Sequence, residues 1–163
     1  MDIKFLEQLK NYPSKYPNDI DYQGTIEPIS LQEIETLEQL YNNGNTFPKA
    51  LRELLFLAGN YCYVLDYGWN ETEEEIQNEL QISARKWLLK YNKNISRPFF
   101  VIDVYNGPEQ FLYIYLDEGN NPFVYQAFLP EQNNIKHFAS LNKSLSEYIN
   151  SLVDRVKQGY NPF

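Results

Sequence analysis

The chain has very little of the residue types that build many familiar sites. Its 163 residues include one cysteine, one histidine and one methionine. A single cysteine, Cys62, excludes an intrachain disulfide and suits a reducing compartment. One His and one Cys cannot build a zinc cluster, and a Ser-His-Asp triad would have to use His137 as its base. We therefore expect no metal, no cofactor and no catalytic residue, and we expect Cys62 to be a buried apolar side chain.

Positive charge and glycine clusters are also scarce. The chain has 14 Lys and Arg against 22 Asp and Glu, a net charge of -8, which argues against direct binding of nucleic acid. The seven glycines are scattered singly, so no glycine-rich phosphate loop is present. No apolar run approaches the roughly 20 residues of a membrane helix, and the first residues lack the apolar core of a signal peptide. We predict a cytoplasmic protein without a membrane partner.

Aromatic residues, in contrast, are abundant. There are 14 Tyr and 10 Phe, and the hydrophobic fraction of 43% is enough for a core. The length favours one domain over residues 1–163. Because tyrosine joins a large ring to a polar hydroxyl, we expect some of these rings to lie half-exposed at an interface.

The segment from Ser30 to Gly59 carries signals for a helix, a turn and a second helix. Ser30 is a good N-cap, and Glu33 completes a capping box. The turn Asn42-Asn43-Gly44 tolerates the left-handed conformation that ends a helix, and Pro48 suits the first turn of the next helix. Each helix has an apolar stripe at helical spacing, made by Leu31, Ile34, Leu37 and Tyr41 and then by Leu51, Leu54, Leu55 and Ala58.

Periodicity and turn residues place the remaining elements. Three strands joined by short turns should pair antiparallel, so we predict an α+β fold with a single antiparallel or mixed sheet of about four to six strands packed with helices. The predicted elements are a helix over Asp2–Asn11, a loop over Tyr12–Gln23, a strand over Tyr61–Leu65, a helix from Asn70 or Thr72 to about Asn92, strands over Pro98–Tyr105, Phe111–Leu116 and Phe123–Leu129, a short edge over Ile135–Phe138, and a helix over Ser144–Val156 that opens with a second capping box.

The helical pair also carries a resemblance to a known family. Its residues read Ile34-Glu35-Thr36-Leu37-Glu38, then Phe47-Pro48, then Leu51-Arg52-Glu53-Leu54-Leu55. This pattern resembles the start of the SUKH superfamily, which comprises Smi/Knr-type cell-wall regulators and bacterial immunity proteins. The resemblance extends over about Ile26 to Val156, and it implies one SUKH-like domain whose core spans 26–156 after an N-terminal helix and loop over 1–25.

Two groups of aromatic residues are candidate partner-binding sites. Strand alternation places Tyr113 and Tyr115 on one face of the sheet with Tyr125, opposite an aliphatic face. Helices could cover both faces, or the tyrosine face could be partly open, since Tyr and Trp are favoured interface residues. The second group joins aromatic residues to an acidic helix start and could equally be core packing; it consists of Tyr61, Tyr63, Tyr67, Trp69, Glu71, Glu73 and Glu74.

These observations lead to three functional hypotheses. The resemblance implies a non-catalytic immunity protein that occludes a bacterial toxin domain, and the net charge of -8 favours a basic toxin. The resemblance also implies the alternative of a regulatory scaffold in cell-wall glucan synthesis. A small hydrolase that uses Cys62 or His137 ranks far behind both. The sequence leaves the oligomeric state and the interface open.

Overall fold

The computed structural model describes residues 1–12, 26–65, 76–104, 109–132 and 135–162. Within these residues it has five helices and one four-stranded antiparallel sheet, so the predicted α+β class is confirmed. The helices are α1 (Glu7–Asn11), α2 (Leu31–Tyr41), α3 (Lys49–Ala58), α4 (Ile76–Lys90) and α5 (Leu145–Lys157). The strands are β1 (Phe99–Val104), β2 (Gln110–Tyr115), β3 (Phe123–Phe128) and β4 (Phe138–Ser144).

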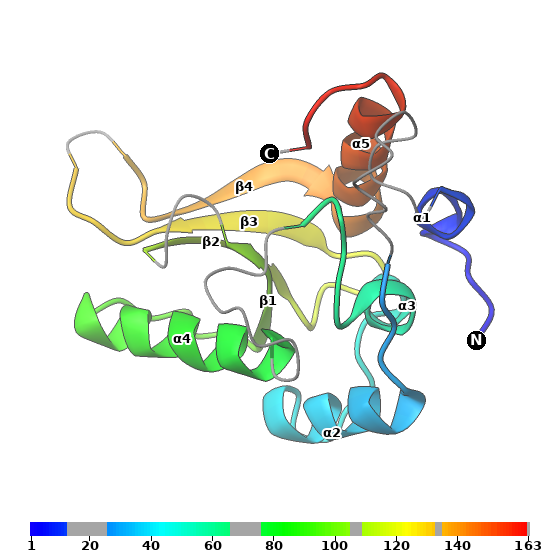
Figure 1. The fold of residues 1–163 in the computed structure, drawn as a ribbon. Helices are drawn as coiled ribbons and strands as arrows, with labels where there is room; N and C mark the ends of the chain where they lie inside the picture. The colour runs from blue at the N-terminus through cyan, green and yellow to red at the C-terminus, as the bar shows by residue number, and fades with distance from the viewer. Residues whose placement is uncertain (13–25, 66–75, 105–108, 133–134, 163) are drawn as a thin grey trace.

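The sheet is a meander, because each strand pairs with the next one in the sequence. Figure 1 shows α4 beside β1, and α5 with α3 at the other side of the sheet. Strand alternation sends aliphatic residues of β2, such as Leu112 and Ile114, into the larger core cluster. There they meet Leu51 and Leu55 of α3 and Ile149 of α5. The predicted aliphatic face is confirmed.

The opposite face of the sheet forms a second cluster with α4. Leu80, Ala84 and Leu88 recur at helical spacing on α4 and pack on Phe111 and Tyr113 of β2. Phe99, Val101 and Val104 of β1 belong to the same cluster. Helix α4 thus covers the part of this face that lies nearest β1.

Helix α4 also satisfies the outer edge of β1. The buried side chain of Gln81 accepts a hydrogen bond from the Val101 N–H at 2.9 Å and donates one to the Val101 carbonyl at 2.7 Å. Arg85 donates to the Phe99 carbonyl at 3.1 Å. An amide side chain therefore takes the place of a neighbouring strand and blocks the backbone edge.

The helical pair has the predicted local structure. Ser30 and Glu33 form the capping box of α2, and the turn adopts positive φ at Asn43 (53°) and Gly44 (77°). Two carboxylates inside the pair have buried structural roles. Glu38 accepts hydrogen bonds from the Phe47 N–H at 2.7 Å and from Arg52 at 3.1 Å, which fixes the step between α2 and α3.

Glu53 of α3 explains why the first helix is shorter than predicted. Its fully buried carboxylate accepts hydrogen bonds from the N–H groups of Lys4, Phe5 and Leu6, at 2.7 to 3.0 Å. Because these N–H groups donate to the Glu53 side chain and not to carbonyl groups of their own segment, the helix begins at Glu7 rather than at Asp2. Leu6 and Leu9 are buried as expected.

Two predicted strands are wrong. Residues 61–65 form a turn, with one isolated bridge between Tyr61 and Glu27, because their apolar side chains are buried in the core rather than alternating across a sheet. The predicted edge strand Ile135–Phe138 is displaced, because the pairing with β3 runs over the more polar segment Phe138–Ser144. The loop Tyr12–Gln23 and the start of the helix before α4 lie, apart from Tyr12, outside the described residues.

Candidate functional site

An aromatic cluster lies on the α4 side of the sheet and extends beyond that helix toward β4. We call it the aromatic face and define it as Tyr113, Tyr115, Phe123, Tyr125 and Phe138. Alternation on β2 and β3 turns these side chains to one side, and Tyr113 is directly opposite Tyr125 in the register. Phe138 joins from β4, opposite Ala127.

Tyr113 is the buried centre of the aromatic face. Its ring stacks on Tyr125 with centroids 5.6 Å apart and meets Tyr115 edge-on at 5.3 Å. Phe138 lies edge-on at 6.4 Å. Burial is the largest cause that raises the pKa of Tyr113, and its hydroxyl oxygen lies 3.3 Å from that of Tyr115. The phenol stays neutral, and the packed rings form a rigid platform.

A charged network borders this platform. The guanidinium of Arg97 lies 3.9 Å from the centroid of the Tyr115 ring and donates to Asp117 and to Glu118. Glu118 in turn accepts a hydrogen bond from the Tyr125 hydroxyl at 2.9 Å. Burial, and then this hydrogen bond, raise the pKa of Tyr125, while the hydrogen bond from Arg97 lowers the pKa of Asp117. The network fixes both tyrosines in orientation.

The outer part of the aromatic face reaches solvent. Phe123 is 49% exposed, and Tyr115, Tyr125 and Phe138 are half-buried. The buried Oε2 atom of Glu118 has no hydrogen-bond partner among the described residues. The face therefore offers exposed aromatic rings, which are suited to contact with a protein surface.

The tyrosines predicted in the second group have a different setting. Tyr63 is 1% exposed and donates its hydroxyl to the Tyr12 carbonyl, and burial raises its pKa. Tyr61 is half-buried against the same core cluster, and Cys62 is buried there as expected. These residues belong to the cluster on the other face of the sheet. The remaining predicted members, Tyr67, Trp69, Glu71, Glu73 and Glu74, lie outside the described residues.

Four residues of this site were not identified from the sequence. Phe123 alternates with Tyr125 on β3, and this pattern predicts its side of the sheet but not its place in a binding site. Phe138 was missed because β4 was misplaced. Arg97 and Glu118 are 21 positions apart, and no local pattern reveals a pair at that separation.

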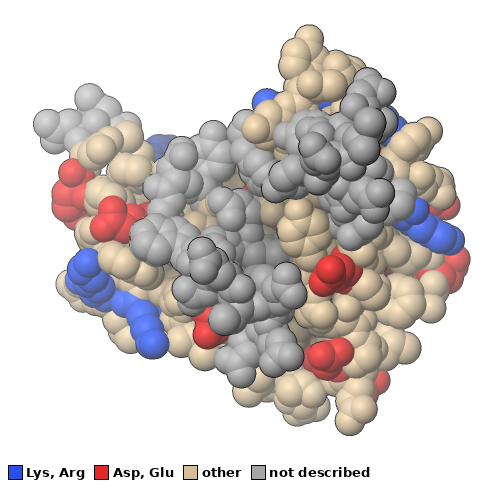
Figure 2. Space-filling model, viewed as in Figure 1, with Lys and Arg blue, Asp and Glu red and all other residues tan. Residues whose placement is uncertain are grey.

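Charge on the described surface is mixed. Figure 2 shows Lys and Arg side chains over the outer end of α4 and beside α1 and α5, with Asp and Glu side chains elsewhere on the same view. At the aromatic face the described charges are Arg97, Asp117 and Glu118. Its aromatic rings, more than its net charge, distinguish this region.

The chain has no significant match among protein-family models, curated proteins or solved structures. None of the helices in the described ranges combines the length and the apolar character that crossing a bilayer would require.

Proposed function

We propose that this chain is a non-catalytic binding protein whose aromatic face covers the active surface of a bacterial toxin domain, as an immunity protein does. The observation that carries the proposal is the exposed outer part of the aromatic face, where Phe123 is 49% exposed beside half-buried Tyr115 and Tyr125. Large aromatic rings held on a rigid support are typical of the residues that dominate interface energies. The cytoplasm is the compartment that we propose.

The resemblance of the helical pair to the SUKH superfamily supports the same function. The residues that carry the resemblance fold into α2 and α3, and their polar members, Glu38 and Glu53, are used in holding the scaffold together. A scaffold with internal polar links can present one face to a partner without rearranging. A basic toxin domain is the partner that the net charge of -8 favours.

Co-expression with the toxin domain tests this function. The C-terminal domain encoded by the gene directly upstream would be induced in bacteria with and without this chain. We expect the wild-type chain to restore growth, and Phe123→Ala to restore much less, because truncating an aromatic residue that dominates an interface commonly costs about 2 kcal/mol or more.

Leu89→Ala is the matched control. Leu89 is 79% exposed on α4 and is also a large apolar side chain, so its loss should leave protection unchanged. Equal protection by both variants would exclude the aromatic face as the binding surface. No protection by the wild-type chain would favour the alternative of a regulatory scaffold in cell-wall synthesis.

A further inference from the structure

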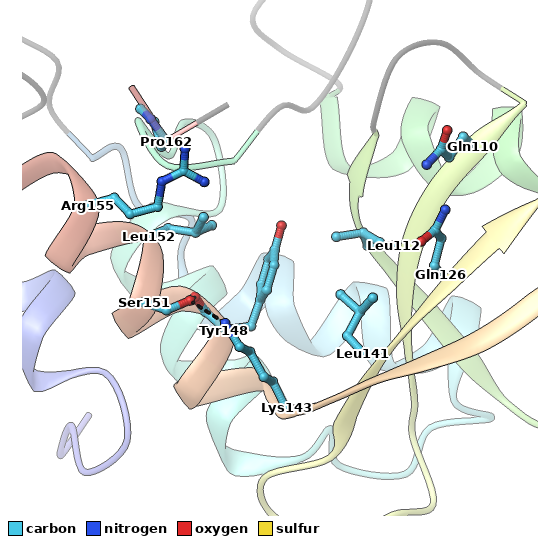
Figure 3. A pocket seen from close by; sticks show the side chains of 10 residues that line it. All are labelled: Gln110, Leu112, Gln126, Leu141, Lys143, Tyr148, Ser151, Leu152, Arg155 and Pro162. Atoms are coloured by element: carbon cyan, nitrogen blue, oxygen red, sulfur yellow. Dashed lines mark hydrogen bonds between the residues drawn. The ribbon is translucent and has the colours of Figure 1, made fainter. Parts of the chain in front are cut away.

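A cavity of about 580 Å³ lies between α5 and the strands, on the side of the sheet opposite the aromatic face. Figure 3 shows its two walls, with α5 on one side and Gln110 and Gln126 of β2 and β3 on the other. Its volume falls within the range of about 300 to 1,000 Å³ that is common for small-molecule sites. None of the described site residues predicted from the sequence lines this cavity, and the proposed function does not involve it.

The inner surface of the cavity is apolar. Leu112 of β2 and Leu152 of α5 are 5% and 7% exposed and line it together with the half-buried Leu141. The Tyr148 ring projects between the two walls in Figure 3. These side chains would contact an aliphatic or aromatic body, and its burial there would be favourable.

The side of the cavity nearest α5 carries two cationic side chains, Lys143 from β4 and Arg155 from α5. Lys143 Nζ donates to Ser151 Oγ at 3.3 Å, and Arg155 lies one helical turn beyond Ser151 on the same side of α5. The guanidinium of Arg155 makes no hydrogen bond or ion pair with any described residue. Of the described residues that line the cavity, two are cationic and none is acidic. The described lining of the cavity is therefore positively charged, although the chain as a whole has a net charge of -8.

The opposite wall supplies neutral polar groups. The half-buried amides of Gln110 and Gln126 form no side-chain hydrogen bond within the described structure. The carboxylate of Asp103 accepts a hydrogen bond from the Tyr148 hydroxyl at 3.0 Å, and Asp103 is 3% exposed. It therefore lies behind the cavity lining rather than in it.

We propose that this cavity binds a small organic anion with an apolar body. The anionic group, a carboxylate or a phosphate ester, contacts Lys143, Ser151 and Arg155, and the apolar body lies on Leu112, Leu152 and the Tyr148 ring. Charge complementarity carries the choice of an anion, since, among the described residues, two cations and no carboxylate line a partly apolar volume. The site is independent of the proposed toxin-binding function.

Nuclear magnetic resonance titration tests the site. Octanoate and octyl phosphate would be added separately to the 15N-labelled full chain, with octanamide as the neutral probe. We expect saturable shifts at the side-chain amides of Gln110 and Gln126 with at least one anion, and at least tenfold weaker binding of octanamide. The more tightly bound anion identifies the carboxylate or the phosphate ester as the natural anionic group.

Variants that remove a positive charge test whether the cavity recognises the anionic group or only the apolar body of the ligand. Arg155→Gln and Lys143→Gln, two exposed side chains whose loss should preserve the fold, are each expected to weaken anion binding at least fivefold. Lys86→Gln on α4, the matched change on the other face, should leave binding unchanged. Equal binding of octanamide, shifts confined to the aromatic face, or binding of a hexaglutamate peptide in preference to both anions would overturn the proposal.

Discussion

At the scale of single residues, the stability of this fold depends on polar side chains that satisfy backbone groups far away in the sequence. Gln81 binds both the N–H and the carbonyl of Val101, twenty positions away. Glu53 binds three N–H groups near the first residue of the chain. The sequence shows both residues only as polar positions on amphipathic helices, so their roles could not be predicted from local patterns.

Replacing Gln81 with Leu should destabilise the protein by about 2 to 4 kcal/mol, because a buried backbone donor and acceptor would lose their partners. Urea unfolding followed by circular dichroism measures the change. Gln32→Leu is the control, since Gln32 is exposed on α2.

The same variant should also associate more readily, because the edge of β1 would be free to pair with another chain. Light scattering measures this association. If Gln81→Leu were as stable and as monodisperse as Gln32→Leu, the edge-capping role of Gln81 would be excluded.

At the scale of elements, both predicted capping boxes are confirmed. The Ser30 N–H donates to Glu33 at 2.7 Å, and the Ser144 N–H donates to Glu147 at 2.8 Å. The first residues of α2 and α5 could be predicted because every residue of a capping box lies within one helical turn. The β4 strand could not, because its sequence FASLNKS has few apolar residues and its position depends on pairing with β3.

The capping boxes predict a pH dependence of stability. The hydrogen bond with the Ser30 side chain, and then that with its backbone, lower the pKa of Glu33. The backbone and then the side chain of Ser144 lower the pKa of Glu147. A carboxyl group with a lowered folded-state pKa stabilises the fold above its unfolded pKa of about 4.3, and this stability is lost as the pH falls through the folded value.

We therefore expect the free energy of unfolding to decrease below about pH 4, and to decrease less steeply in the double variant Glu33→Gln and Glu147→Gln. Urea unfolding at a series of pH values measures both slopes. Glu35→Gln serves as the control, because Glu35 is exposed on α2. Identical slopes in the double variant and the wild type would contradict the role given to the two boxes.

At the scale of the whole molecule, the two faces of the sheet are covered unequally. The core clusters place the aliphatic face against residues of α1, α2, α3 and α5, and the other face against α4. Alternation along β2 and β3 predicted which residues share a face, but it left open how far helices cover the tyrosines. In the structure the tyrosines are only partly covered, since Tyr113 is buried while Tyr115 and Tyr125 are half-buried.

The unequal cover gives the molecule two chemically distinct surfaces. One is the aromatic face, with Phe123 at its exposed outer end. The other is the cavity beside α5, with Lys143 and Arg155 on its wall. A protein partner suits the first and a small anion the second, and changes at one should leave binding at the other intact, because the sheet separates them.

The central claim is that the aromatic face binds a toxin domain, and calorimetric titration of that purified domain into this chain tests it most directly. We expect a Kd near or below about 1 nM for the wild type, at least a tenfold higher Kd for Phe123→Ala, and no change for Leu89→Ala. Absence of binding, or tight binding that Phe123→Ala leaves unaltered, would contradict the claim.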